Sequence, residues 1–139
     1  MPIYTCTTPE GTLSATQRAF VAAEITRIHA AHTGAPPSFV RAVFQTLTPD
    51  SFFTAGKSAK NFLLVGIIRT GRSTEVKARM LNDLWSMYKK ATGAQDDQIN
   101  ITLMDVPGSN AMEFGGVLPE AGNEKEWFAS RGPSDRWSG

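Results

Sequence analysis

The sequence contains one pattern twice, 59 residues apart. Ile3–Ser14 (IYTCTTPEGTLS) aligns with Phe62–Ser73 (FLLVGIIRTGRS), and at the same spacing Thr33-Gly34 falls on Thr92-Gly93. Each copy predicts a strand, a loop, a helix, a glycine that ends the helix, and a second strand. Such a chain can fold in few ways, because each strand–helix–strand unit pairs its two strands in parallel through a right-handed crossover.

Capping residues predict the bounds of two helices. Ser14 with Gln17 three residues later forms a capping box, which predicts a helix over about 15–32 that ends at Gly34. Ser73 begins a second helix over about 74–91, which Gly93 ends. The expected apolar anchors are Phe20, Ile25 and Ile28 in the first helix and Val76, Met80, Leu84 and Met87 in the second.

The predicted strands are residues 2–6, 39–47, 62–69 and 99–106. They form one four-stranded sheet with both helices on one face, an α/β fold of two consecutive β-α-β units. The other face needs a cover, because 62–68 is apolar at nearly every position. No further helix is long enough to provide one, so we expect this face to pack against other copies of the chain in a closed oligomer.

The length of 139 residues predicts one domain. Unit one spans about 2–47, a linker about 48–61, unit two about 62–106, and a C-terminal tail 107–139. Two adjacent phenylalanines in the linker predict a hairpin or a loop laid over a neighbouring subunit. The apolar residues of the tail indicate docking on the body of the protein or on a neighbour.

Composition excludes several classes of function. The net charge is +1 and no Lys/Arg run occurs, so no nucleic-acid partner is expected. No signal peptide or membrane-length apolar stretch is present, which predicts a cytoplasmic protein without a membrane partner. The sequence has no metal-ligand cluster, phosphate-binding glycine motif or serine nucleophile elbow, so no cofactor is expected. Cys6, the single cysteine, is predicted to be buried.

Pro2 follows the initiator methionine and opens the first strand. Removal of Met1, which is common before a small residue, would leave a free secondary amine. An α-amino group titrates near neutral pH, far below a lysine ammonium, and the proline ring fixes the direction of its lone pair. The alternative is that Pro2 follows Met1 without functional meaning, as in many unrelated chains.

Arg69 and Arg72 stand at the exit of the third strand, on either side of Gly71. Two guanidiniums beside a helix N-terminus can bind a carboxylate in a bidentate manner; the alternative is a pair of solvated loop charges. Under the 59-residue shift Pro2 falls on Asn61. If the first and third strands run antiparallel, as a pseudo-two-fold axis between the units requires, the arginines lie beside Pro2.

Two further residues have alternatives that remain open at this point. His29 lies near the end of the first helix and shares a face with Ile25, which is typical of a packed histidine at the edge of a core. Glu113 lies in an apolar stretch of the tail, where its carboxylate is either exposed at a loop tip or turned into a pocket.

Four motifs in this order resemble the tautomerase superfamily, and most of all its cis-3-chloroacrylic acid dehalogenase group. They are the proline after Met, TRIHAAHTG with His29, IIRTGRS, and MEFGGVLPEAGNEKEWF with Glu113. The resemblance implies a homotrimer of double β-α-β protomers with Pro2 as the catalytic amine. It also implies that Arg69 and Arg72 hold a small carboxylated substrate, that His29 supports carboxylate binding, and that Glu113 activates water.

Two positions depart from the dehalogenase pattern. Thr102 stands where the dehalogenases have a tyrosine that helps to position water, and Phe114 follows Glu113 where they have another tyrosine. The resemblance places both in the substrate-binding set. A threonine hydroxyl is shorter and far less acidic than a phenol, so efficient dehalogenation is not expected, whereas proton transfer by Pro2 is unaffected.

The charges around Pro2 decide whether its amine is a base or an acid. The arginines and an apolar wall lower its pKa, and Glu113 raises it. A neutral Pro2 suits a tautomerase that acts on a carboxylated enol such as phenylenolpyruvate. A protonated Pro2 suits a hydratase or dehalogenase of 3-haloacrylic or acetylenic acids. The missing tyrosine favours the tautomerase, and a non-catalytic trimeric binding module is the third alternative.

Overall fold

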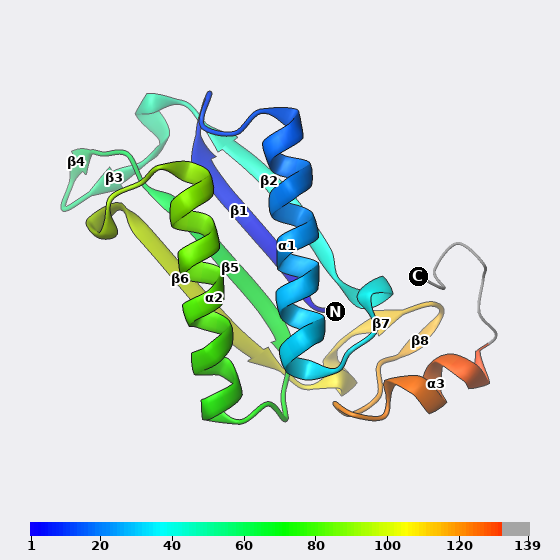
Figure 1. Ribbon diagram of the computed structural model, residues 1–139. Helices are drawn as coiled ribbons and strands as arrows, with labels where there is room; N and C mark the ends of the chain where they lie inside the picture. Colours follow the sequence, from blue (N-terminus) through cyan, green and yellow to red (C-terminus); the bar gives the residue numbers. More distant parts are fainter. Residues whose placement is uncertain (132–139) are drawn as a thin grey trace.

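The computed structural model describes residues 1–131, and Figure 1 shows one sheet with two long helices on the same face. The sheet consists of β1 (Ile3–Pro9), β2 (Arg41–Leu47), β5 (Phe62–Arg69) and β6 (Ile99–Val106), and the helices are α1 (Ala15–Thr33) and α2 (Thr74–Thr92). The strand order is β2-β1-β5-β6. β1 and β2 are parallel, as are β5 and β6, whereas β1 and β5 are antiparallel. The predicted fold class is therefore confirmed.

Both helices begin and end where their caps predict. The Ser14 hydroxyl accepts a hydrogen bond from the Gln17 amide at 3.1 Å, and the Gln17 side chain accepts one from the Ser14 amide at 2.8 Å. Ser73 caps α2 in the same way. Gly34 and Gly93 have φ angles of 73° and 70°, the left-handed conformation that lets a helix end on glycine.

The core lies between the helices and the sheet. Cys6 is buried there, as predicted, and burial raises the pKa of its thiol to about 12. Phe20 is not an anchor of α1, because it is 58% exposed, and the neighbouring Val21 is buried in its place. The main core residues are Tyr4, Cys6, Val21, Ile25, Ile28, Leu64, Ile68, Leu84 and Tyr88.

Two predicted strand bounds are wrong. β2 begins at Arg41, because Pro37–Phe39 forms a turn of 3-10 helix. The prolines at 36 and 37 fix φ and lack amide donors, so they cannot join a ladder. β1 extends to Pro9 rather than to residue 6, because its pairing with β2 continues to the Pro9–Leu47 pair.

The strand register corrects the spacing of the repeat within the sheet. Pro9 pairs with Leu47 as Arg69 pairs with Val106, so β1 and β5 are related by a shift of 60 residues. An odd shift would put the two strands out of phase, since side chains alternate between the faces of a sheet. Arg69 therefore corresponds to Pro9.

The helices and second strands keep the shift of 59, so unit one has one more residue between its first strand and its helix. In the first strands, the residue that corresponds to Asn61 is Met1 rather than Pro2.

Two hairpins and a short helix complete the described chain: β3 (Phe53–Thr54), β4 (Lys57–Ser58), β7 (Met112–Glu113), β8 (Gly116–Val117) and α3 (Glu124–Ser130). The linker is thus a hairpin. In the tail, Phe114, Leu118, Trp127 and Phe128 pack with Met1 and Phe39 at the end of the sheet where the chain begins (Figure 1). Residues 132–139 of the tail lie outside the described residues, and the assignment of 1–139 to one domain stays a prediction.

The face of the sheet opposite the helices carries exposed apolar side chains. Ile3, Val43 and Met104 are 36%, 44% and 51% exposed. Within residues 1–131 no helix has the length and apolarity needed to cross a membrane.

Candidate active site

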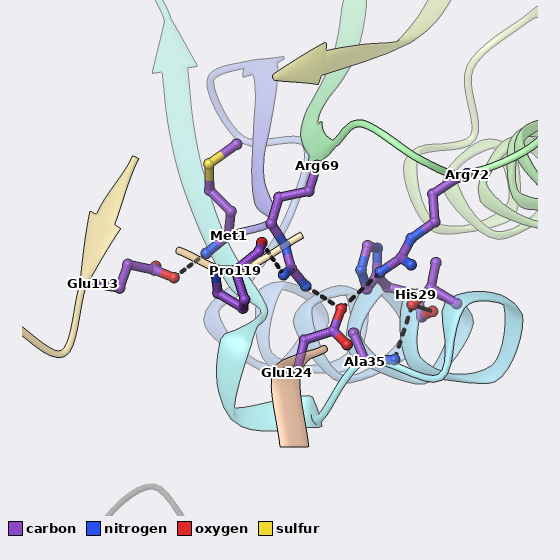
Figure 2. Close-up of polar contacts among 9 residues, drawn as sticks. Met1, His29, Ala35, Arg69, Arg72, Glu113, Pro119 and Glu124 are labelled. Atoms are coloured by element: carbon purple, nitrogen blue, oxygen red, sulfur yellow. Dashed lines mark hydrogen bonds and ion pairs between the residues drawn. The ribbon is translucent and has the colours of Figure 1, made fainter. Parts of the chain in front are cut away.

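The amino terminus is buried rather than free in solvent. Met1 is 5% exposed and the Pro2 side chain is fully buried. The Met1 amine forms an ion pair with the carboxylate of Glu113 (Figure 2). The Pro2 carbonyl oxygen accepts a hydrogen bond from the Arg41 amide at 3.0 Å. The hairpin β7–β8 thus turns Glu113 inward, and the start of the chain is held in place on two sides.

The antiparallel pairing of β1 with β5 brings the arginines to the same place. Ile3 pairs with Ile67, so Arg69 leaves β5 beside the amino terminus. Arg72 follows at the start of α2. The juxtaposition predicted from a pseudo-two-fold axis is therefore observed.

Glu124 joins the two arginines. Its Oε1 accepts hydrogen bonds from Nη2 of Arg69 and, at 3.2 Å, from Nη2 of Arg72 (Figure 2). Arg69 also donates from Nη1 to the Pro119 carbonyl oxygen at 3.0 Å. Its guanidinium carbon lies 5.6 Å from the centre of the Phe39 ring. These are not solvated loop charges, because Arg69 is only 3% exposed.

His29 lies on the α1 side of this cluster. Its Nδ1 is 2.7 Å from the hydroxyl of Tyr4, and both side chains are buried. Burial, then the charges of Arg72, Arg69 and the amino terminus, lower the pKa of His29 to about 3 despite the opposing charge of Glu124. His29 is therefore neutral at pH 7, and it offers one N–H donor and one acceptor.

The amino-terminal amine is a weaker base than a solvated one. Burial lowers its pKa most, the hydrogen bond and charge of Glu113 raise it, and the charges of Arg41 and Arg69 lower it again. The net effect is a pKa below the usual value of 8.0. The competition that the sequence analysis left open is thus decided for the Met1 amine in the direction of a neutral base.

An apolar wall adjoins these charges. The Met1 side chain packs against Phe39 and Leu118, with Ile67 and Phe114 partly buried beside it. The Phe114 ring lies 4.9 Å from that of Phe128 and 5.6 Å from that of Phe39, centre to centre. The site therefore combines an amine, cations and an apolar surface of aromatic rings.

The structure brings together six of the seven predicted residues. Thr102 is the exception within one protomer. It pairs with Val65, four residues before Val106, which pairs with Arg69. That spacing is about 13 Å along the strand. Thr102 instead lies on the sheet face opposite the helices, where its hydroxyl donates to the Asn100 side chain at 3.1 Å.

Three residues of the site were not predicted. Arg41 places a charge near the amine, Glu124 joins the arginines, and Tyr4 holds His29. A signal existed for Tyr4, because it faces the helices in strict alternation along β1. Glu124 has no such signal, since it is one of several acids in a polar stretch of the tail.

Such an arrangement suits proton transfer on a small anion. The arginines can bind a carboxylate, and a neutral amine beside them can remove a proton from an adjacent carbon. Among residues 1–131 no group of three or more His, Cys, Asp or Glu side chains is arranged to hold a metal ion.

Comparisons with known proteins agree with this chemistry. A family model described as "Putative oxalocrotonate tautomerase enzyme" matches residues 1–131. Among curated proteins no significant match is found. The crystal structure of native Ps01740 is 40% identical with a TM-score of 0.78, over 80% of this chain and 99% of that one.

Two further solved structures are similar. N1, a member of the cis-3-chloroacrylic acid dehalogenase family, is 28% identical with a TM-score of 0.88, over 98% of this chain and 95% of that one. A fused 4-OT wild-type symmetric trimer shares the fold at 20% identity and a TM-score of 0.76, over 84% of this chain and 94% of that one. The family match over nearly the whole chain shows that this protein belongs to the oxalocrotonate tautomerase-like family of the tautomerase superfamily.

Proposed function

We propose that this protein is a tautomerase that interconverts the keto and enol forms of a small carboxylated substrate, with the Pro2 nitrogen as acid and base. The observation that carries the proposal is the buried amino terminus with a lowered pKa beside Arg69 and Glu113. It requires removal of Met1, since the Pro2 nitrogen is a tertiary amide while Met1 remains. The Pro2 side chain is fully buried, so the freed nitrogen would stay at this end of the sheet.

The reaction needs one proton to move between carbon and the amine. In the direction of enol formation, Pro2 takes a proton from the carbon next to the keto group. Arg69 and Arg72 hold the carboxylate and stabilise the negative charge that develops on the keto oxygen. In the reverse direction Pro2 returns the proton to the same carbon. Neutral His29 can hydrogen-bond the carboxylate without adding a charge.

The surroundings of Met1 support a substrate with an apolar substituent. Loss of Met1 would vacate a space of methionine size between Phe39 and Leu118. A phenyl ring would fill such a space and pack on the aromatic wall. Phenylenolpyruvate combines that ring with an enol and a carboxylate, and it is the substrate we propose to test first.

Hydration or dehalogenation of 3-haloacrylic or acetylenic acids is the second candidate. It is favoured by the contact between Glu113 and the amine, because a carboxylate there can activate water. The similarity to N1 points in the same direction. Thr102 lacks the phenol that this chemistry uses in the dehalogenases, so we expect at most low efficiency.

The exposed apolar face of the sheet supports assembly into a homotrimer. Ile3, Val43 and Met104 would be covered there, and the fused 4-OT structure is a symmetric trimer. Light scattering on the purified protein should give three times the mass of the chain. A monomer at micromolar concentration would contradict this assembly.

The test of the function compares three proteins by their ultraviolet absorbance with phenylenolpyruvate. The first is the wild type, whose intact mass should lack Met1. Pro2→Ala should lower kcat/KM by about a hundredfold or more, the range typical of a lost general acid or base. A chain with a residual N-terminal tag, in which the Pro2 nitrogen is an amide, should be inactive. Undiminished turnover in either variant would refute the role of Pro2, and carboxylate binding without turnover would indicate a binding module.

A further inference from the structure

Glu124 binds both arginines of the proposed site, although it comes from the short C-terminal helix α3 (Figure 2). We propose that Glu124 is a positioning residue, which holds Arg69 and Arg72 in the orientation that binds the substrate carboxylate. This inference rests on the proposed function, because it explains how the same site is set up.

Burial makes an internal partner for the arginines necessary. The side chains of Arg69, Arg72 and Glu124 are 2%, 9% and 7% exposed. A buried guanidinium without a counter-charge is strongly destabilising. One carboxylate shared by two guanidiniums leaves a net positive charge of one in this triad. That remaining charge suits a substrate with a single carboxylate.

Glu124 is itself held by the backbone. Burial alone would raise the pKa of its carboxyl group, but hydrogen bonds from the amides of Glu124 and Gly122, with the charge of Arg69, keep it below the usual value. A carboxylate fixed by its own turn of chain is a poor candidate for displacement by substrate. The backbone contacts therefore favour a permanent support over a lid that leaves.

Arg72 keeps one donor for a ligand. Its Nε has no hydrogen-bond partner, and it is the only buried side-chain nitrogen or oxygen in that state within the described part of the chain. Its Nη2 is already occupied by Glu124 at 3.2 Å. Because an unpaired buried N–H is costly, the Nε is poised to donate to a substrate oxygen. Glu124 thus fixes one end of the guanidinium fork and leaves the other available.

The competing idea is that Glu124 imitates the substrate carboxylate and blocks the arginines. The two ideas predict opposite effects of removing its charge. If Glu124 competes, Glu124→Gln raises the net positive charge and tightens carboxylate binding. If Glu124 positions, the same change frees the arginines to turn away and weakens it.

The experiment measures kcat and KM for phenylenolpyruvate and, by calorimetry, the Kd of benzoate, a carboxylate that cannot tautomerise. Glu124→Gln should raise both KM and Kd by about tenfold, which is the scale of one lost charged hydrogen bond. We expect kcat to change less than threefold. Glu124→Asp keeps the charge and should fall between wild type and Glu124→Gln. Glu126→Gln, an exposed acid two residues along α3, is the matched control and should change nothing.

Each outcome decides between the ideas. Unchanged or tighter benzoate binding by Glu124→Gln overturns the proposal. A purely structural role would reduce the folded fraction, which lowers apparent kcat and leaves KM and Kd unchanged; that result also overturns it. If Glu124→Gln does not fold, Glu124→Asp is compared with wild type, and an unchanged Kd overturns the proposal.

Benzoate also separates this inference from the proposed function. Wild-type binding of benzoate without turnover of the enol would refute the tautomerase and leave the effect of Glu124 measurable. Failure of the wild type to bind benzoate would refute the proposal itself.

Discussion

Each end of the sheet is closed by a two-stranded hairpin, and the two hairpins have nearly the same backbone. Ala55 and Phe114 occupy the same turn position with φ angles of 52° and 53°, and the next residues, Gly56 and Gly115, have φ angles of 76° and 79°. Even one hydrogen bond recurs, since Asn61 donates to the Thr54 hydroxyl at 2.8 Å where the Met1 amine meets Glu113.

The side chains at the two ends differ in the groups that carry chemistry. Thr54 replaces Glu113 and Pro9 replaces Arg69. The first end has a cavity of about 720 Å³ that Pro9, Leu47, Phe52 and Asn61 help to line. At the second end α3 and the aromatic residues pack on the hairpin. The duplication thus provides two equal scaffolds, and a few residues of the second unit and the tail make only one of them a site.

The largest effect should come from the arginines, which only one end has. Arg72→Ala removes a charged donor to the substrate carboxylate and should lower kcat/KM by about a hundredfold, mostly through KM, as expected for one or two hydrogen bonds to a charged group. The absorbance assay with phenylenolpyruvate measures this. Arg79→Ala on the exposed face of α2 is the control. Equal activity of the two variants would show that the charged end is not the site.

The helices differ at one equivalent position: His29 of α1 corresponds to Tyr88 of α2, 59 residues later. His29 has a pKa of about 3 in the folded chain against 6.5 for the unperturbed side chain. The neutral form is therefore favoured by folding, and this stability is present above pH 6.5 and is lost as the pH falls towards 3. One proton taken up on unfolding changes the free energy by about 1.4 kcal/mol per pH unit.

Between pH 6.5 and pH 5 wild type should consequently lose about 2 kcal/mol more stability than His29→Gln. Urea unfolding at a series of pH values measures both slopes, and the absolute loss caused by the substitution cancels in the comparison. His32→Gln, at a more exposed position on the same helix, should keep the wild-type slope. Parallel curves for wild type and His29→Gln would contradict the burial of a neutral histidine.

The same comparison explains what could be predicted from the sequence. The helix caps, the strands of unit two and the antiparallel contact between units follow from local residues and from the repeat. The shift of 60 in the first strands could not be predicted, because one added residue in a loop leaves the apolar pattern similar while the register sets the faces. Glu124 and Arg41 escaped notice because their roles depend on contacts between the tail and β2, and such long-range contacts leave no local pattern.

Glu113 offers a sharper test of the difference from Thr54. Its carboxylate raises the pKa of the amino-terminal amine against the effect of burial, so Glu113→Gln should lower that pKa and move the acid limb of the pH–rate profile to lower pH. At pH 7 tautomerisation should change less than threefold, a shift of under about 1 kcal/mol. Any release of chloride from 3-chloroacrylate should disappear. Thr54→Val at the other hairpin is the control, and an acid limb that moves to higher pH would contradict this account.

The smallest effects concern the shared turn itself. Ala55 adopts a left-handed conformation that is unfavourable for any residue with a side-chain carbon, so Ala55→Gly should raise the free energy of unfolding by about 0.5–1 kcal/mol. Phe114 has the same φ but packs on Phe39 and Phe128. Phe114→Gly relieves the same strain and loses more in aromatic packing, so it should be destabilised by roughly 1–2 kcal/mol. Urea denaturation of the two variants measures the opposite signs. Destabilisation of both would mean that strain in this turn is not what glycine relieves, and stabilisation of both would mean that the ring of Phe114 contributes little to the end of the sheet that carries the proposed site.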